Sequence, residues 1–218
     1  MILVPVKNLA NSKQRLAPVL DAGERSTLAA AMLEDVLETL AGWTSRPPVA
    51  VVTGEPWAYS LARKFSFRVI EDTANESETD AIAMATRACE ADGAKMTLVL
   101  PSDVPLVRAR ELEQILAAAP PQGAVLVPAR DERGTNAALR RPAALFALRF
   151  GDDSFHPHVS AATATGHPCV ILRLPGIGLD VDQPADLSEL LRRRGQSRAQ
   201  SLLREWKVAE RLIPAHTR

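Results

Sequence analysis

Short apolar runs alternate with longer amphipathic stretches along most of this chain, and no other feature limits the fold as much. Residues 1–6, 49–52 and 96–100 are apolar runs of strand length, while residues 22–40 place apolar side chains every three to four positions. Runs of the first kind are typical of strands buried on both faces, and the second spacing predicts a helix. Strands that alternate with helices indicate a mostly parallel sheet with helices on both sides. We therefore predict a single-domain α/β three-layer sandwich with a mostly parallel central sheet.

The remaining elements follow from the same periodicities and from glycine and proline breakers. Strands are predicted at residues 68–70, 124–127, 137–140 and 169–174. Helices are predicted at residues 57–64, 81–91, 110–119, 142–150 and 184–191, with one more ending near Gly166. The domain is expected to span residues 1–191, followed by a helical, arginine-rich tail at residues 192–218.

Composition excludes several classes of protein. The chain of 218 residues has 46% apolar residues, 26 basic and 26 acidic side chains, so no broad electrostatic surface for nucleic acid or membrane is expected. Its two cysteines, Cys89 and Cys169, form no metal-binding spacing, and no apolar stretch reaches 18 residues. We expect a cytoplasmic monomer or homodimer that acts on small molecules.

Three cations follow the first predicted strand. Lys7, Lys13 and Arg15 stand in a polar segment with Asn8, Asn11 and Ser12. A strand that ends in such a loop is how α/β proteins present groups to phosphate. Taken alone, the segment is equally consistent with ordinary solvated charges.

Three aspartates stand where other strands end. Asp103 follows the run at 96–100 between two prolines, and Asp180 and Asp182 face one side of an extended segment. Carboxylates at such a place suit Mg²⁺, which binds one or two carboxylates together with phosphate oxygens. Helix or turn capping by Asp103 and Asp182 is the alternative.

Two loops are candidates for binding an anion. They are Gly134-Thr135-Asn136 and Gly151-Asp152-Asp153-Ser154, whose glycines permit close approach and whose hydroxyl and N–H groups donate. Plain turns are the alternative.

Two further polar groups are interpreted as structural. The three histidines His156, His158 and His167 are interpreted as surface or turn residues, because their spacing fits no metal site and Pro157 is expected to break a helix. The alternative for His158 is that it assists anion binding. Residues 77–80 (SETD) are interpreted as a helix N-terminus that lines the site if it lies at the end of a strand.

Six blocks of sequence, taken in order, resemble one family. They are PVKNLANSKQRLAPVL, MLEDVL, LPSDVPLV, GTNAALRRP, FGDDSFHPHVSAA and LDVDQPADLSELL. This pattern is similar to the CofC/FbiD guanylyltransferases of coenzyme F-420 biosynthesis, which have a Rossmann-like fold of the nucleotidyltransferase/GT-A type. The resemblance runs from Ile2 to Leu191 and leaves the last 25 or so residues outside.

The resemblance implies an activity: transfer of GMP from GTP to a small phosphorylated acid, with release of pyrophosphate. It implies that Lys7, Lys13 and Arg15 bind the GTP phosphates and that Asp103, Asp180 and Asp182 hold Mg²⁺. Lys13, Arg15 and Asp103 are then the catalytic residues, and Thr135, Gly151 and Ser154 hold the acceptor. In-line attack on a phosphorus needs positioning and charge neutralisation but no nucleophilic side chain.

One departure bears on the acceptor. Where the family has a Gly-Leu-Asn-Ala-Ala-like segment, this chain has residues 77–82 (SETDAI), a more polar wall that favours 3-phospho-D-glycerate over phosphoenolpyruvate or 2-phospho-L-lactate. The alternatives are another nucleotidyltransferase or a GT-A-like glycosyltransferase of the same fold, and a non-catalytic GTP-binding module. The absence of a glycine-rich first loop speaks against the sugar-nucleotide enzymes, and the retained Asp103 and Asp180 speak against the binding module.

Overall fold

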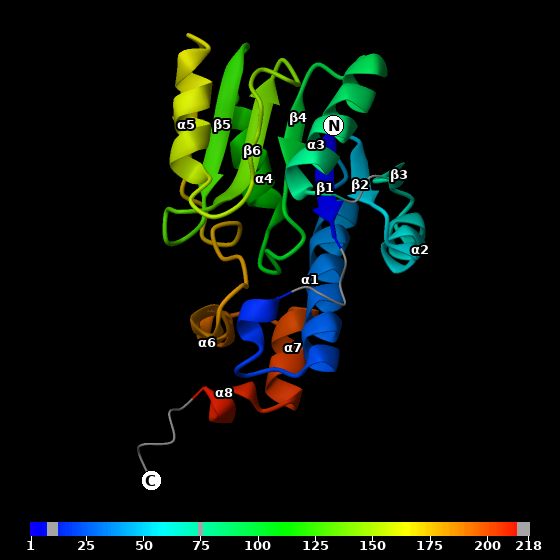
Figure 1. Ribbon diagram of the computed structural model, residues 1–218, viewed down its shortest axis with the longest axis vertical. Helices are drawn as coiled ribbons and strands as arrows, with labels where there is room; N and C mark the ends of the chain where they lie inside the picture. The colour runs from blue at the N-terminus through cyan, green and yellow to red at the C-terminus, as the bar shows by residue number, and fades with distance from the viewer. Residues whose placement is uncertain (8–12, 74–75, 213–218) are drawn as a thin grey trace.

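A seven-stranded sheet forms the centre of the molecule (Figure 1). The computed structural model describes residues 1–7, 13–73 and 76–212. In this part of the chain the strand order is β3-β2-β1-β4-β6-β5-β7. The strands are β1 (Ile2–Val6), β2 (Val49–Thr53), β3 (Arg68–Glu71), β4 (Thr97–Val99), β5 (Gly123–Pro128), β6 (Thr135–Arg141) and β7 (Cys169–Ile171).

All pairings are parallel except those of β6, which runs antiparallel to both β4 and β5. Every residue of β1, β2 and β5 is buried, as their sequences, apolar apart from Thr53 at the end of β2, lead one to expect. Because β6 is reversed, its first residue lies at the edge where the parallel strands end. A loop that enters β6 therefore meets the loops that leave β4 and β5.

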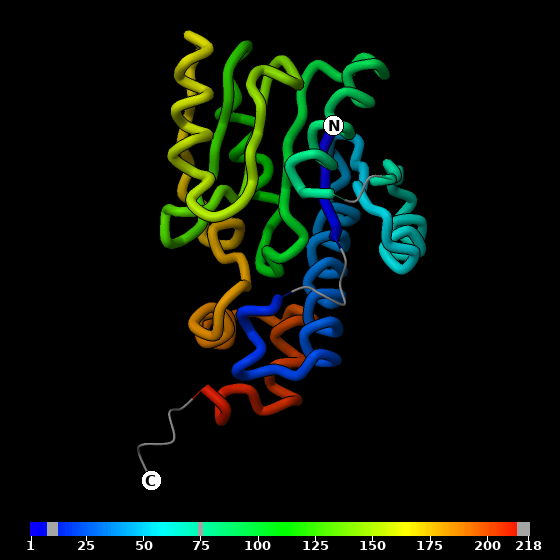
Figure 2. Tube along the Cα trace, viewed as in Figure 1, coloured from blue at the N-terminus to red at the C-terminus, as the bar shows by residue number. Residues whose placement is uncertain are grey.

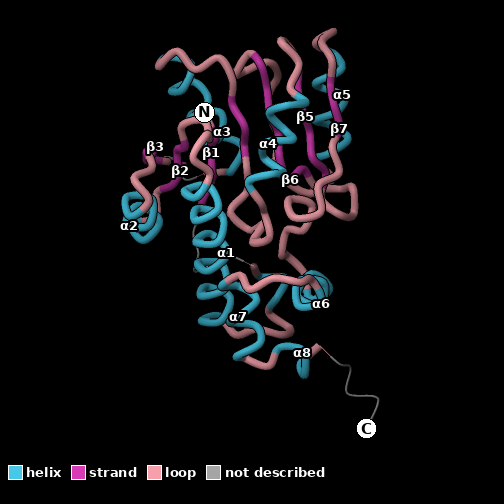
Figure 3. The backbone as a smooth tube through the Cα atoms, turned by 180° about the vertical axis from the view of Figure 1, so that it is seen from behind, coloured by secondary structure: helices cyan, strands magenta, loops and turns pink. Residues whose placement is uncertain are grey.

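Helices cover both faces of the sheet. The helices are α1 (Ala22–Gly42), α2 (Pro56–Lys64), α3 (Glu78–Ala91), α4 (Ala109–Ala118), α5 (Phe155–Ala164), α6 (Pro184–Arg192), α7 (Arg198–Glu205) and α8 (Val208–Arg211). Buried side chains of α1, α2 and α4 pack in one core cluster, and those of α3 and α5 pack in another on the opposite face. Figure 3 shows the α1 and α4 side from behind. The predicted three-layer α/β sandwich is confirmed.

A third core cluster lies beyond the end of the sheet. It joins Leu16 and Leu20 to the first half of α1 and to α6, α7 and α8, with Leu187, Leu203 and Val208 among its buried members. Figure 2 shows the segment after residue 13 against the C-terminal helices. Asp21 begins α1 with a capping box to Glu24, an arrangement typically stabilising by about 1 kcal/mol. The tail thus forms part of the support for the segment that carries Lys13 and Arg15.

Two local predictions differ from the structure. Residues 142–150 do not form a helix, because their carbonyl groups are bound by side chains: Thr97 Oγ1 donates to the Ala143 carbonyl at 2.6 Å and Arg140 to the Phe146 carbonyl at 2.7 Å. The second difference is that α5 begins at Phe155 and includes Pro157. Proline is tolerated in the first turn of a helix, where its missing N–H would have no partner inside the helix.

Candidate active site

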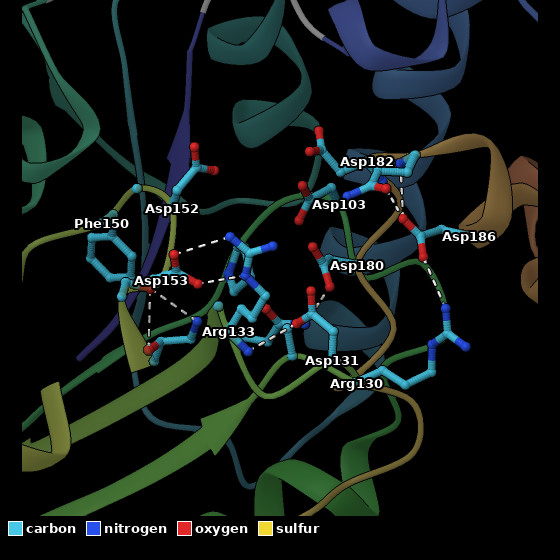
Figure 4. A pocket seen from close by; sticks show the side chains of 18 of the residues that line it. Asp103, Arg130, Asp131, Arg133, Phe150, Asp152, Asp153, Asp180, Asp182 and Asp186 are labelled. Carbon is cyan, nitrogen blue, oxygen red and sulfur yellow. Dashed lines mark hydrogen bonds and ion pairs between the residues drawn. The ribbon is translucent and has the colours of Figure 1, made fainter. Parts of the chain in front are cut away.

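A cleft of about 490 Å³ opens where the parallel strands end. Asp103 reaches it from the loop after β4, Arg130 from the end of β5 and Thr135 from the start of β6 (Figure 4). Its charged lining is strongly acidic, with eight carboxylates and three arginines: Glu78, Asp103, Asp131, Asp152, Asp153, Asp180, Asp182 and Asp186, and Arg15, Arg130 and Arg133.

Lys13 neutralises two of these carboxylates. Its Nζ lies 2.5 Å from Asp103 Oδ2 and 3.7 Å from Asp182 Oδ1. Burial of the Lys13 ammonium opposes its charge, but the adjoining Asp103 and Asp182 carboxylates outweigh this cost, and the pKa of Lys13 is raised. Lys13 has a left-handed backbone (φ 56°), which directs the chain from this site into the short helix at Gln14–Leu16.

Arg15 spans the mouth of the cleft. Its guanidinium donates to Asp182 Oδ2 at 2.8 Å and to Asp152 Oδ1 at 2.9 Å. These two carboxylates belong to segments 30 residues apart, so Arg15 ties the loop before α5 to the loop before α6. Both ion pairs are partly solvent-exposed, and pairs of this kind contribute little to stability.

The three aspartates predicted to hold Mg²⁺ all line this cleft (Figure 4). The Val181 N–H donates to the Asp103 carbonyl at 3.1 Å, which docks the segment carrying Asp180 and Asp182 beside the end of β4. Asn136 Nδ2 donates to Asp180 Oδ1 at 2.9 Å. Burial and the neighbouring Asp103 carboxylate raise the pKa of Asp180 to about 6.

The unpaired oxygen of Asp103 fits a cation site. Asp103 Oδ1 is buried and has no hydrogen-bond partner within the described chain. In the same described residues, no three Asp, Glu, His or Cys side chains are already gathered as a metal site, and the Lys13 ammonium lies against two of the aspartates. Hard carboxylate oxygens that repel one another are the donor set a divalent cation prefers.

Glu78 adds a further carboxyl group to this wall. It is the first residue of α3 and lines the cleft. Burial and the Asp103 carboxylate raise the pKa of Glu78 to about 7. The prediction that residues 77–80 begin a helix is confirmed, and Glu78 is the residue of that run that lines the cleft.

Hydroxyl groups gather where the start of β6 meets the residues just before α5. The Thr135 N–H donates to Ser154 Oγ at 3.2 Å, and both side chains are buried but line the cleft. Gly151 has φ 137°, a conformation that side-chain-bearing residues rarely adopt. The structure thus brings Thr135, Gly151 and Ser154 together in one cleft with the aspartates.

Lys7 lies apart from this lining. Its Nζ is 2.7 Å from Asp72 Oδ2, beyond the end of β3, and its charge acts on Glu78. The polar residues Asn8, Asn11 and Ser12, named with it in the sequence, lie outside the described residues. Lys7 therefore pairs with Asp72 outside the cleft lining and acts on Glu78 through its charge, whereas Lys13 and Arg15 contact Asp103 or Asp182 directly.

The interpretation of the histidines is wrong for one of them. His156 is exposed, but His158 is only 1% exposed and bonds to Thr135 and to the backbone of Arg149. The burial of His158 does not follow from the sequence, because Pro157 is expected to break a helix but occupies the first turn of α5. The alternative, that His158 assists anion binding, stays a prediction.

Comparison with models of known protein families shows to which family this chain belongs. The sequence model described as "Guanylyl transferase CofC like" matches residues 1–214. The chain belongs to the CofC-like guanylyltransferase family. It is therefore a nucleotidyltransferase, as the six sequence blocks implied. The match extends into the tail, so the expectation that the last 25 or so residues lie outside the family is wrong.

Relatives with assigned names support this placement. The chain is 37% identical to the phosphoenolpyruvate guanylyltransferase of Roseiflexus castenholzii, over 94% of this chain and 93% of that protein. It is 30% identical to the 2-phospho-L-lactate guanylyltransferase of Methanothermobacter thermautotrophicus, over 93% and 89%.

Solved structures agree on the fold of this CofC-like chain. A protein from Desulfovibrio desulfuricans G20, described as a nucleotide-diphospho-sugar transferase, matches with a TM-score of 0.78 at 20% identity, over 96% of each chain. A CMP:2-keto-3-deoxy-manno-octonic acid synthetase bound to CTP matches with a TM-score of 0.59 at 15% identity, over 94% and 98%. In the described part of the chain, no helix is both long and apolar enough to span a membrane.

Proposed function

We propose that this protein transfers GMP from GTP to the phosphate of a small phosphorylated carboxylic acid, as a step in coenzyme F-420 biosynthesis. A phosphate oxygen of the acid attacks the α-phosphorus of GTP. The new phosphorus–oxygen bond replaces the bond to the bridging oxygen, and pyrophosphate leaves with that oxygen's electron pair. The reaction needs no oxidant and no covalent intermediate on the protein.

The observation that carries this proposal is that two sets of polar groups meet at one cleft. In the first set, the cationic side, Lys13 and Arg15 lie against Asp103 and Asp182; in the second, the hydroxyl side, Thr135 and Ser154 present hydroxyl groups. We assign the cationic side to the GTP phosphates and the hydroxyl side to the acceptor. Lys7, whose charge acts on Glu78, adds positive charge near the nucleotide side.

Asp103, Asp180 and Asp182 would hold Mg²⁺ beside these phosphates. The bound ion would neutralise charge that builds up as two anions are brought together. The buried, unpaired Oδ1 of Asp103 and the raised pKa of Asp180 support this assignment, because both show carboxylates that lack full compensation by the protein.

Two observations bear on the identity of the acceptor acid, and they favour different acids. Names of the relatives favour phosphoenolpyruvate or 2-phospho-L-lactate. The polar residue Glu78 in the cleft wall favours 3-phospho-D-glycerate, whose extra hydroxyl can bond to a carboxyl group. We place phosphoenolpyruvate first and retain 3-phospho-D-glycerate as the alternative.

A pyrophosphate-release assay tests the proposal. The purified protein is incubated with Mg²⁺ and GTP, ATP or CTP, each with phosphoenolpyruvate, 2-phospho-L-lactate, 3-phospho-D-glycerate or no acid. We expect release with GTP and one of the three acids, and a product whose mass equals GMP joined to that acid. Glycerate, which lacks the phosphate, is the matched negative control. Acid-dependent release with CTP but not with GTP would overturn the proposal. So would the absence of acid-dependent release with every nucleotide.

A further inference from the structure

His158 lies directly behind the hydroxyl side of the cleft. Its Nδ1 is 2.8 Å from Thr135 Oγ1, and its Nε2 is 2.8 Å from the backbone N of Arg149. The imidazole is 1% exposed and is not part of the cleft lining, so it reaches a ligand only through Thr135. Its ring also meets the edge of Phe150, a residue of the cleft wall, at a centroid distance of 5.3 Å.

These two bonds fix the tautomer of His158. A backbone N–H can only donate, so His158 Nε2 must accept the bond from Arg149. In a neutral imidazole the other nitrogen then carries the hydrogen, and Nδ1–H donates to Thr135 Oγ1. Burial and the nearby Arg140 guanidinium lower the pKa of His158 to about 4, so the ring is neutral at physiological pH.

The direction of this bond determines what the hydroxyl groups can offer a ligand. Thr135 Oγ1 accepts from His158, while Ser154 Oγ accepts from the Thr135 N–H. The two hydroxyl oxygens, 3.4 Å apart, share at most one hydrogen between them. At least one hydroxyl hydrogen is left to point into the cleft, and an anion is the ligand that such a donor suits.

We propose that His158 is a positioning residue that makes the Thr135–Ser154 pair a hydrogen-bond donor to the anionic acceptor. The same imidazole holds Arg149, at the start of the loop that carries Gly151 and Ser154, and so sets the distance between the two hydroxyl groups. The identity of the ligand as the phosphorylated acid rests on the proposed function, whereas the orientation of Thr135 does not.

Two substitutions separate the two bonds of His158. His158→Gln can place its carbonyl near the Nε2 position and keep the bond from Arg149, but loses the donor at Nδ1. His158→Asn places an amide nitrogen near Nδ1 and keeps the bond to Thr135. We expect His158→Gln to raise KM for the acid about tenfold with KM for GTP unchanged, which is the loss of one net hydrogen bond. His158→Asn should recover most of this loss.

Combination with Thr135→Val provides the decisive control. Once the hydroxyl is absent there is nothing for His158 to orient, so His158→Gln should add no further increase in KM for the acid. Equal effects of His158→Gln with and without the Thr135 hydroxyl would show a merely structural role and overturn the proposal. An unchanged KM in His158→Gln would also overturn it.

A measurement on the wild-type protein tests the tautomer without any assay of activity. Long-range proton–nitrogen NMR spectra of ¹⁵N-histidine-labelled protein distinguish a protonated ring nitrogen from an unprotonated one. The spectra should show His158 with hydrogen on Nδ1, with His158→Asn providing the assignment. Hydrogen on Nε2 would overturn the inference even if guanylyl transfer is confirmed, and failure of all three acids would overturn the proposed function while leaving this result valid.

Discussion

Asp103 links the two halves of the candidate site. Its side chain binds Lys13 and raises the pKa of both Asp180 and Glu78, while its carbonyl accepts the N–H of Val181. The Asp103 side chain thus influences its neighbours through its charge, whereas the Asp103 backbone holds the segment around Val181 in place. A change confined to the carboxylate should therefore alter chemistry without moving the neighbouring segment.

Asp103→Asn tests this separation. We expect turnover to fall at least about a hundredfold, because a charged group at the reacting phosphates is lost. The melting temperature should change by only a few degrees, since the Val181 bond to the backbone remains. Turnover and thermal unfolding are measured on the same preparation.

The matched control is Asp92→Asn. Asp92 follows the last residue of α3, outside the cleft lining, and pairs with Arg68 on the surface. This substitution should leave turnover unchanged. Undiminished turnover in Asp103→Asn would contradict the role given to this carboxylate.

His158 makes a second residue-scale prediction, on the pH dependence of stability. Its pKa is about 4 in the folded protein and about 6.5 in an unfolded chain, so between these values only the unfolded state binds the proton. The folded state therefore loses stability as the pH falls from 6.5 towards 4, by roughly 3 kcal/mol at most.

Denaturant unfolding at pH 7 and at pH 4.5 measures this contribution. The free energy of unfolding of His158→Gln should fall less than that of the wild type over this interval. His156→Gln removes an exposed histidine and should follow the wild type. Parallel loss in wild type and His158→Gln would show that His158 does not account for the pH dependence.

At the level of single residues, the sequence indicates which charged groups belong to the site but not which of them contact one another. Lys13, Asp103, Asp180 and Asp182 could be predicted to meet, because segments that leave parallel strands share one edge of the sheet. Lys7 follows the same rule but pairs with Asp72, a partner that only the third strand's position reveals. The burial of His158 depends on α5, which starts two residues before Pro157. No local sequence pattern predicts this helix start.

At the level of elements, the C-terminal helices support the segment that carries Lys13 and Arg15. Leu203 of α7 is fully buried in the cluster that also contains Leu16 and Leu20, the residues that follow Arg15. Gln200 Nε2 ties α7 to the end of α6 by donating to the Leu190 carbonyl at 2.8 Å. A substitution that weakens this packing should therefore alter the positions of Lys13 and Arg15.

Leu203→Ala is predicted to destabilise the protein by about 2 to 4 kcal/mol, as is usual for a buried leucine. KM for GTP should rise as well, because the segment holding Arg15 loses its packing. Ile115→Ala, in α4 and in a different cluster, should cost similar stability with no change in KM for GTP. Equal KM values in the two variants would show that the tail does not support the site.

The elements that could be predicted are those whose sequence alone determines their burial. The runs in β1 and β5 are apolar throughout, and that in β2 is apolar up to Thr53, so both their identity and their buried position follow. Residues 142–150 have helical composition, but Thr97 of β4 and Arg140, at the end of β6, donate to their carbonyl groups. A bond such as that of Thr97, from a residue 46 positions away, overrides local preference and is not visible in a linear pattern.

At the scale of the whole molecule, charge balance conceals a local excess. The chain has equal numbers of acidic and basic residues, yet the cleft lining has eight carboxylates against three arginines. Lys13 offsets part of this excess by contacting Asp103 and Asp182. A site with this balance repels GTP unless cations enter with it, since the nucleotide brings further negative charge.

Divalent cations should therefore stabilise the protein and be required for GTP binding. We expect Mg²⁺ to raise the melting temperature in a concentration-dependent way, because a ligand that binds only the folded state stabilises it by mass action. In Asp180→Asn the shift should be much smaller, while Asp92→Asn should retain it. Titration calorimetry with GTP in EDTA should show binding at least about tenfold weaker than in Mg²⁺. Equal GTP affinity under the two conditions would mean that Lys13 and the arginines alone overcome the carboxylates, and the assignment of Asp103, Asp180 and Asp182 to a cation would be wrong.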